Sequence, residues 1–130
     1  MRVLYVCTGN SFRSPVAEAL TRKYHPDMEV ESAGTGATDH VAENARELLE
    51  EVDALQYVKP SPDQLSQRAV DEADVVVTMM PGHRDFLEEN FDMEGKDVRT
   101  WRVSDPVNRG VSPREAFEKL EQLVRSLPEP

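Results

Sequence analysis

The stretch from Val3 to Pro15 has the sequence VLYVCTGNSFRSP and decides how the chain begins to fold. Its first four residues form a short apolar run with β-branched members, which is typical of a buried β-strand. Ser14-Pro15 predicts the start of a helix, because serine caps helices and proline suits their first turn. Residues 7 to 13 are therefore expected to form a loop that joins a strand to a helix.

The same alternation of strands and helices continues along the chain. Apolar runs predict further strands over Met28–Ser32, Ala73–Met79 and Val98–Val103. Apolar spacing, capping residues and prolines predict helices over Asn44–Val52, over a segment capped by Asp63 that runs to Val70, over Pro81–Asn90, and from Ser112 to Leu127. Strands separated by helices imply parallel pairing, so we expect one α/β domain over residues 1–130. We expect a three-layer sandwich: a central parallel sheet of about four strands, helices on both faces, and the loop after the first strand.

The composition is acidic, because 25 aspartates and glutamates against 15 lysines and arginines give a formal net charge of −10. Such a chain repels polyanions, so nonspecific nucleic-acid binding is not expected. Only four of the basic residues are lysines. An acid-rich, lysine-poor surface suits high salt, where screening removes self-repulsion. Two interpretations stay open, a halophilic origin or simply an acidic, soluble surface.

No apolar run approaches the roughly 20 residues that span a bilayer, so no membrane association is expected. The apolar run near Met1 is also too short for a signal peptide, and the cytoplasm is the expected location. Cys7 is the single cysteine and so forms no intramolecular disulfide. With three scattered histidines it makes a poor metal site, and no metal or organic cofactor is expected. Taken alone, a lone cysteine also fits a small buried hydrophobic residue.

The loop from Cys7 to Arg13 has the features of an anion site with a reactive thiol. Backbone N–H groups of Thr8, Gly9, Asn10, Ser11, Phe12 and Arg13 can wrap an anion, and the following helix N-terminus favours negative charge. The same field stabilises a thiolate, so Cys7 is predicted to be a nucleophile. The Arg13 guanidinium can bind two phosphate oxygens. Ser14 is placed to hydrogen-bond the Cys7 sulfur, and Asn10 can brace the loop.

This spacing, a cysteine, five residues and then Arg-Ser, resembles the active-site motif of cysteine-dependent phosphatases. The longer sequence VCTGNSFRSPVAE, over residues 6 to 18, is similar to the low-molecular-weight protein tyrosine phosphatase family. Two further segments resemble that family. In the sequence ESAGT over residues 31 to 35, the resemblance implies that Ser32 supports the phosphate loop. Asp105-Pro106 resembles the family's general-acid loop.

The resemblance implies a mechanism without metal or cofactor. Cys7 attacks the phosphorus of a phosphate monoester held by Arg13 and the loop, and a Cys7-phosphate intermediate forms. Asp105 acts first as general acid and then as general base, and inorganic phosphate is released. The implied substrate is a phosphorylated protein, phosphotyrosine above all, or a small phosphate ester.

Departures from the family leave alternatives open. Phe12 stands where many members have a second cysteine, and the supporting histidine of the family has no clear match near Pro60-Ser61-Pro62. For His40 and His83 two positions are open, the rim of the site or the solvated surface, and we expect the solvated surface. Related folds reduce arsenate, and a single-cysteine reductase that uses an external thiol is one alternative. A non-catalytic anion-binding module is the other.

Overall fold

The computed structural model describes residues 1–106 and 110–127, and its centre is a parallel sheet. Four strands pair in the order β2-β1-β3-β4, with every neighbour parallel. The strands are β1 (Arg2–Cys7), β2 (Glu29–Gly34), β3 (Val75–Thr78) and β4 (Asp97–Thr100). Because β1 lies between β2 and β3, its carboxyl end is placed at the middle of one edge of the sheet.

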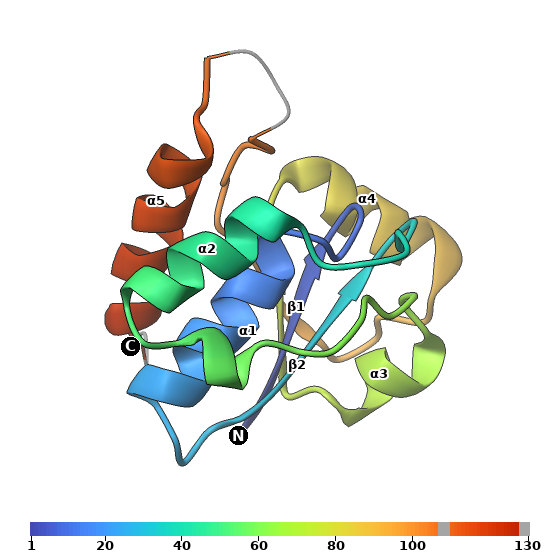
Figure 1. Ribbon diagram of the computed structural model, residues 1–130. Helices are drawn as coiled ribbons and strands as arrows, with labels where there is room; N and C mark the ends of the chain where they lie inside the picture. The colour runs from blue at the N-terminus through green and yellow to red at the C-terminus, as the bar shows by residue number, and fades with distance from the viewer. Residues whose placement is uncertain (107–109, 128–130) are drawn as a thin grey trace.

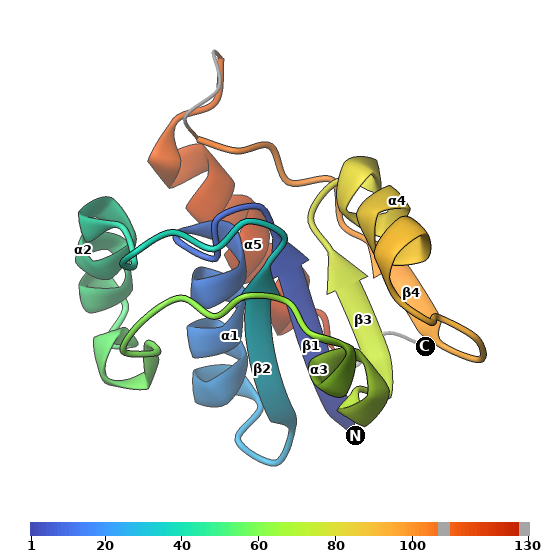
Figure 2. The ribbon, with the colours of Figure 1, turned by 90° about the vertical axis from the view of Figure 1, so that its right-hand side faces the viewer.

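Helices cover both faces of the sheet, so the predicted three-layer sandwich is confirmed (Figures 1 and 2). One layer contains α1 (Arg13–Tyr24), α2 (Glu43–Glu51) and α5 (Pro113–Arg125). The other contains α3 (Gln67–Glu72) and α4 (Pro81–Asn90). A short 3₁₀ turn, Leu55–Tyr57, follows α2.

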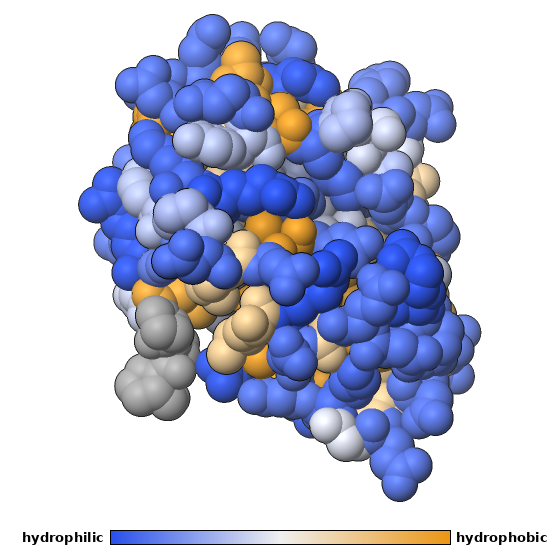
Figure 3. Space-filling view, turned by 90° about the horizontal axis from the view of Figure 1, so that it is seen from below, coloured by the Kyte–Doolittle hydropathy of each residue, from blue (hydrophilic) through white to orange (hydrophobic). Residues whose placement is uncertain are grey.

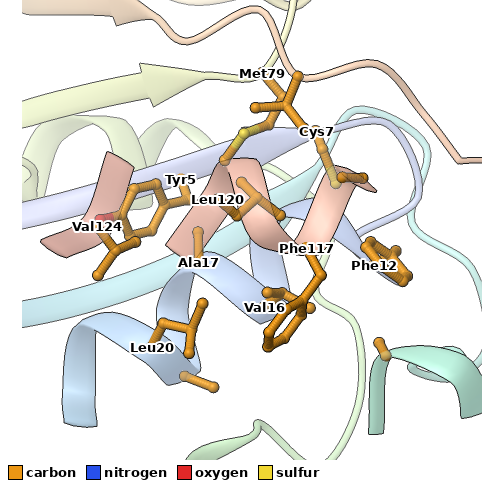
Figure 4. Packing of buried hydrophobic residues seen from close by; sticks show 14 of the residues in the cluster. Tyr5, Cys7, Phe12, Val16, Ala17, Leu20, Met79, Phe117, Leu120 and Val124 are labelled. Carbon is orange, nitrogen blue, oxygen red and sulfur yellow. The ribbon is translucent and has the colours of Figure 1, made fainter. Parts of the chain in front are cut away.

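Alternation along β1 divides the core between the two faces, as the strand period of two residues requires. Val3, Tyr5 and Cys7 belong to the cluster that packs against α1 and α5, whereas Leu4 and Val6 belong to the cluster on the other face. Figure 4 shows side chains of α1 and α5 meeting β1 in the first cluster. β1 is thus buried on both faces and holds Cys7 at its end rigidly.

Two helix starts differ from the sequence prediction. The cap of α3 is Ser66, whose hydroxyl accepts a hydrogen bond from the Ala69 N–H, so the predicted cap by Asp63 was wrong. Asp63 instead pairs with Lys59 at 2.8 Å, and its N–H donates to Asn10. Helix α1 begins at Arg13 after Phe12, with no side-chain cap. The Ser14 side chain is directed to the phosphate loop instead of capping α1.

The face seen from below, where the amino ends of the strands lie, is formed mostly by hydrophilic residues, with apolar residues visible in small patches between them (Figure 3). Among the described residues, no helix is long and apolar enough to cross a membrane.

At Gly34, the backbone of β2 lies very close to the loop that follows β1. A Cβ at this position would lie 2.5 Å from the Thr8 carbonyl oxygen and 2.9 Å from the Asn10 nitrogen. We therefore expect Gly34→Ala to push the loop away and to lower the free energy of unfolding by about 1–3 kcal/mol. Gly82→Ala is the control, because a Cβ there meets no atom within 4 Å. Urea unfolding measures both, and equal midpoints for Gly34→Ala and the wild type would contradict the expectation.

Candidate active site

The loop after β1 is fixed from outside through its carbonyl groups. The carbonyl oxygens of Cys7, Thr8, Gly9 and Ser11 accept hydrogen bonds from the N–H groups of Thr35, Gly36, Thr38 and Ala42, at 2.9 to 3.0 Å. In a trans peptide the C=O of one residue and the N–H of the next point in opposite directions. The N–H groups of Thr8, Gly9, Asn10 and Phe12 therefore point to the other side of the loop, as an anion cradle requires.

A pocket of about 330 Å³ opens on that side of the loop. Its lining combines the loop with the segment before α2, the first turn of α2 and the loop after β4, namely Cys7, Thr8, Gly9, Ser11, Phe12, Arg13, Gly36, Thr38, Ala42, Asn44, Asp105 and Pro106. Cys7 and Asp105 are thus brought together from opposite ends of the chain.

The Cys7 thiol is held by a chain of hydrogen bonds behind the loop. The Ser14 hydroxyl lies 2.9 Å from Cys7 Sγ, and Asn10 Nδ2 donates to Ser14 Oγ at 2.7 Å. Because Ser14 Oγ accepts from Asn10, its own proton is available to the sulfur. Asn10 has a left-handed backbone with φ of 52°, which asparagine tolerates better than most residues. The support predicted for Ser14 and Asn10 thus has a matching geometry.

Ser32 lies deeper in the same network, at the position that the family resemblance indicates. Its hydroxyl donates to Glu18 Oε1 at 2.6 Å and accepts from Asn10 Nδ2 at 3.0 Å. Ser32, Asn10 and Glu18 are all buried. The loop therefore rests on a polar layer that is closed off from solvent.

Lys59 is a site residue that the sequence analysis did not find. Its ammonium group is buried and donates to Asn10 Oδ1 at 2.7 Å and to the Ser32 carbonyl oxygen at 2.8 Å. A lysine has only donors, so it turns the carbonyl end of the Asn10 amide toward itself and the N–H₂ end toward Ser14. Lys59 directly precedes the segment Pro60-Ser61-Pro62, near which the sequence has no clear match for the family's supporting histidine.

Arg13 is almost fully buried and is oriented by three segments. Its guanidinium donates to the Val103 carbonyl oxygen at 3.0 Å, to Thr8 Oγ1 at 3.3 Å and to Asp105 Oδ2 at 3.5 Å. Asp105 keeps 31% of its side chain exposed, whereas Arg13 keeps 4%. The Asp105 carboxyl group therefore lies between the buried guanidinium and the open pocket.

His83 is buried, so the expected surface position was wrong, whereas His40 is exposed as expected. The His83 ring reaches back from α4 to lie 2.9 Å from Thr8 Oγ1. Burial, together with the nearby positive charge of Arg13, lowers the pKa of His83 to about 4 from its ordinary value of 6.5, and Asp105 opposes this effect. The imidazole is therefore neutral near pH 7.

The lowered pKa of His83 makes stability depend on pH in a defined window. The unfolded chain binds a proton on this histidine more readily than the folded chain, so stability falls as pH drops from 6.5 toward 4. We expect His83→Gln, which cannot titrate, to lose less stability than the wild type over this window. Urea unfolding at several pH values measures the difference, and parallel curves for the two proteins would contradict it.

No group of three or more histidine, cysteine, aspartate or glutamate side chains in the part of the chain that the structure describes is arranged to hold a metal ion.

The comparisons with known proteins agree with this geometry. Residues 2–129 match the family model of the low molecular weight phosphotyrosine protein phosphatases. A protein-arginine-phosphatase of Geobacillus stearothermophilus is 34% identical over an alignment of 143 positions including gaps, which covers 98% of this chain and 94% of the relative. The chain therefore belongs to the low molecular weight phosphotyrosine protein phosphatase family, and it is a cysteine-dependent phosphatase.

Solved structures share the fold over nearly the whole chain. A low molecular weight protein tyrosine phosphatase from T. tengcongensis has a TM-score of 0.86 and 27% identity, covering 98% of this chain and 97% of its own. A YwlE arginine phosphatase mutant with a phosphorylated active-site serine has a TM-score of 0.84 and 29% identity, covering 98% and 93%. Relatives named for phosphotyrosine and for phosphoarginine thus resemble this chain about equally.

Proposed function

We propose that this chain removes phosphate from phosphorylated protein side chains by a two-step reaction at Cys7. The observation that carries the proposal is that Cys7, Arg13 and Asp105 line one pocket. Four carbonyl groups of the loop that forms this pocket accept hydrogen bonds from the segment Thr35 to Ala42, on the side away from the pocket. That arrangement offers a nucleophile, a cation and a carboxyl group around one anion. Each of the three has a distinct role.

In the first step the Cys7 thiolate attacks phosphorus, and the bond between phosphorus and the leaving group breaks. The loop N–H groups and Arg13 stabilise the charge on the phosphate oxygens as the transition state forms. Asp105 gives its proton to the leaving atom. The products are the dephosphorylated side chain and a phosphoryl group on Cys7 Sγ.

In the second step the Asp105 carboxylate takes a proton from a water molecule that attacks phosphorus. The sulfur–phosphorus bond breaks, the thiolate returns, and inorganic phosphate leaves. The related YwlE mutant supports this proposal, because its active-site serine is the phosphorylated residue. None of the relatives reported above is a reductase, so arsenate reduction with an external thiol gains no support from them.

Phosphotyrosine is the first substrate candidate, because the family model is that of phosphotyrosine protein phosphatases. Phe12 is the one aromatic side chain among the described pocket-lining residues, but it is buried in the core cluster and offers a substrate ring little surface. We propose a phosphorylated protein as the partner, inorganic phosphate as a product, and the cytoplasm as the location. Small aryl phosphates should be hydrolysed by the same reaction.

Phosphoarginine is the second candidate, and the wall of the pocket favours it. Beside the loop, Thr38, Ala42 and Asn44 give small or polar side chains rather than a second aromatic surface. A planar, polar guanidino group suits such a wall better than a phenyl ring does, since it needs hydrogen-bonding partners. A relative named as a protein-arginine-phosphatase is 34% identical to this chain.

Two substitutions test the proposed reaction. Cys7→Ser should abolish turnover of p-nitrophenyl phosphate while inorganic phosphate still binds, because the cradle remains. Asp105→Asn should lower kcat/KM, which reports the first step, on the order of 10²–10⁴-fold for alkyl phosphates, whose leaving groups need a proton, and much less for p-nitrophenyl phosphate. Steady-state kinetics and calorimetric phosphate titration measure both effects. A Cys7→Ser variant with wild-type turnover would refute the proposal.

The choice between the two substrates needs one matched comparison. Two peptides of the same sequence, one with phosphotyrosine and one with phosphoarginine, are hydrolysed side by side and released phosphate is measured. We expect kcat/KM to be about tenfold or more higher for phosphotyrosine, because the family model is that of phosphotyrosine protein phosphatases. A ratio reversed in favour of phosphoarginine would replace the first candidate by the second and leave the chemistry at Cys7 unchanged.

A further inference from the structure

Behind the phosphate loop, His83 contacts Thr8, the residue that follows the nucleophile in the sequence. His83 lies at the start of α4, and its two ring nitrogens both have partners. Nδ1 accepts from the Met80 N–H at 3.1 Å, and Nε2 lies 2.9 Å from Thr8 Oγ1. Only 7% of His83 is exposed, so solvent offers little competition for these bonds.

The partners of His83 determine which nitrogen carries the proton. The Met80 N–H can only donate, so Nδ1 must be an acceptor. The neutral imidazole therefore carries its proton on Nε2 and donates it to Thr8 Oγ1. The lowered pKa of His83 agrees with this single neutral tautomer.

Thr8 Oγ1 consequently accepts from two donors. One is His83 Nε2–H, and the other is an N–H of the Arg13 guanidinium at 3.3 Å. A hydroxyl oxygen has two lone pairs and one proton, so with both lone pairs used Thr8 offers only its proton to a further partner. Thr8 lines the same pocket as Cys7, and a phosphate oxygen in that pocket accepts such a proton.

We propose that His83 is a positioning residue for phosphate binding, acting through Thr8. By donating to Thr8 Oγ1, His83 makes the Thr8 hydroxyl a donor to the bound phosphate. It also fixes the position of Thr8 Oγ1, which accepts a hydrogen bond from the Arg13 guanidinium. The inference rests on the proposed function, since the ligand is the phosphate that Cys7 attacks. The expected loss on removing either member is one hydrogen bond to a charged group.

The other role for His83 is merely structural, since its ring also bonds the first turn of α4. A residue that only stabilises α4 would lower stability and leave phosphate affinity unchanged in the folded protein. His83→Leu compared with Thr8→Val separates the two roles, because Thr8→Val removes the hydroxyl through which His83 is proposed to act. Phosphate affinity is therefore the measurement that decides between the roles.

The test is calorimetric titration of the full chain with inorganic phosphate. Thr8→Val should weaken the phosphate Kd roughly tenfold, the usual effect of losing one hydrogen bond to a charged group. His83→Leu should weaken the Kd by about three- to tenfold, and His83→Gln should recover most of that loss because it retains an N–H donor. In the double variant His83→Leu should add nothing to Thr8→Val, because its effect passes through the missing hydroxyl.

His25→Leu is the matched control. His25 also bonds a single distant partner, the Val124 carbonyl oxygen at 2.6 Å, but it lies at the far end of α1. This variant should bind phosphate like the wild type.

Wild-type phosphate affinity in Thr8→Val, or losses that multiply in the double variant, would overturn the proposal. Should His83→Leu fail to fold, Thr8→Val still tests the proposal, because an unchanged phosphate Kd in this variant would overturn it. Because the titration measures binding and not turnover, its outcome is separate from that of Cys7→Ser.

Discussion

The structure depends on one constraint, the outward direction of the carbonyl groups in the loop after β1. The segment from Thr35 to Ala42 uses its N–H groups to bind those carbonyls, and this leaves the opposite edges of the same peptides facing the pocket. Gly34 lets β2 lie against the loop closely enough for these bonds to form. The anion site is thus a consequence of sheet geometry as much as of the loop sequence, because β2 and β1 are parallel neighbours.

A buried polar layer keeps that geometry in place at some cost to stability. Lys59, Asn10, Ser32 and Glu18 are buried and connected by hydrogen bonds, and taking charges out of water is unfavourable unless each one is paired. An apolar layer of similar volume would pack without this penalty. We infer that the layer is retained because it gives the loop one conformation and directs the Ser14 proton to Cys7 Sγ.

Much of this arrangement was predictable from the sequence, and what was missed has a common physical cause. The apolar run of β1, the loop spacing from Cys7 to Arg13 and the alternation of elements are local patterns, and they predicted the parallel sheet and the edge that carries the site. Residues whose role depends on distant partners were missed. Lys59 meets Asn10 across 49 positions and His83 meets Thr8 across 75, and no periodicity records such contacts. Asp63, a suitable cap by its local sequence, instead pairs with Lys59, and its N–H donates to Asn10 across 53 positions.

The central claim is that phosphate passes through the sulfur of Cys7. The most direct measurement is rapid quenching of Asp105→Asn during turnover of p-nitrophenyl phosphate, followed by mass spectrometry of the peptide that contains Cys7. Slow hydrolysis in this variant should let the intermediate accumulate. The account predicts the added mass of one phosphoryl group on Cys7 and its loss after longer incubation. Continued turnover with no phosphorylated peptide, or with the phosphoryl group on another residue, would contradict the account.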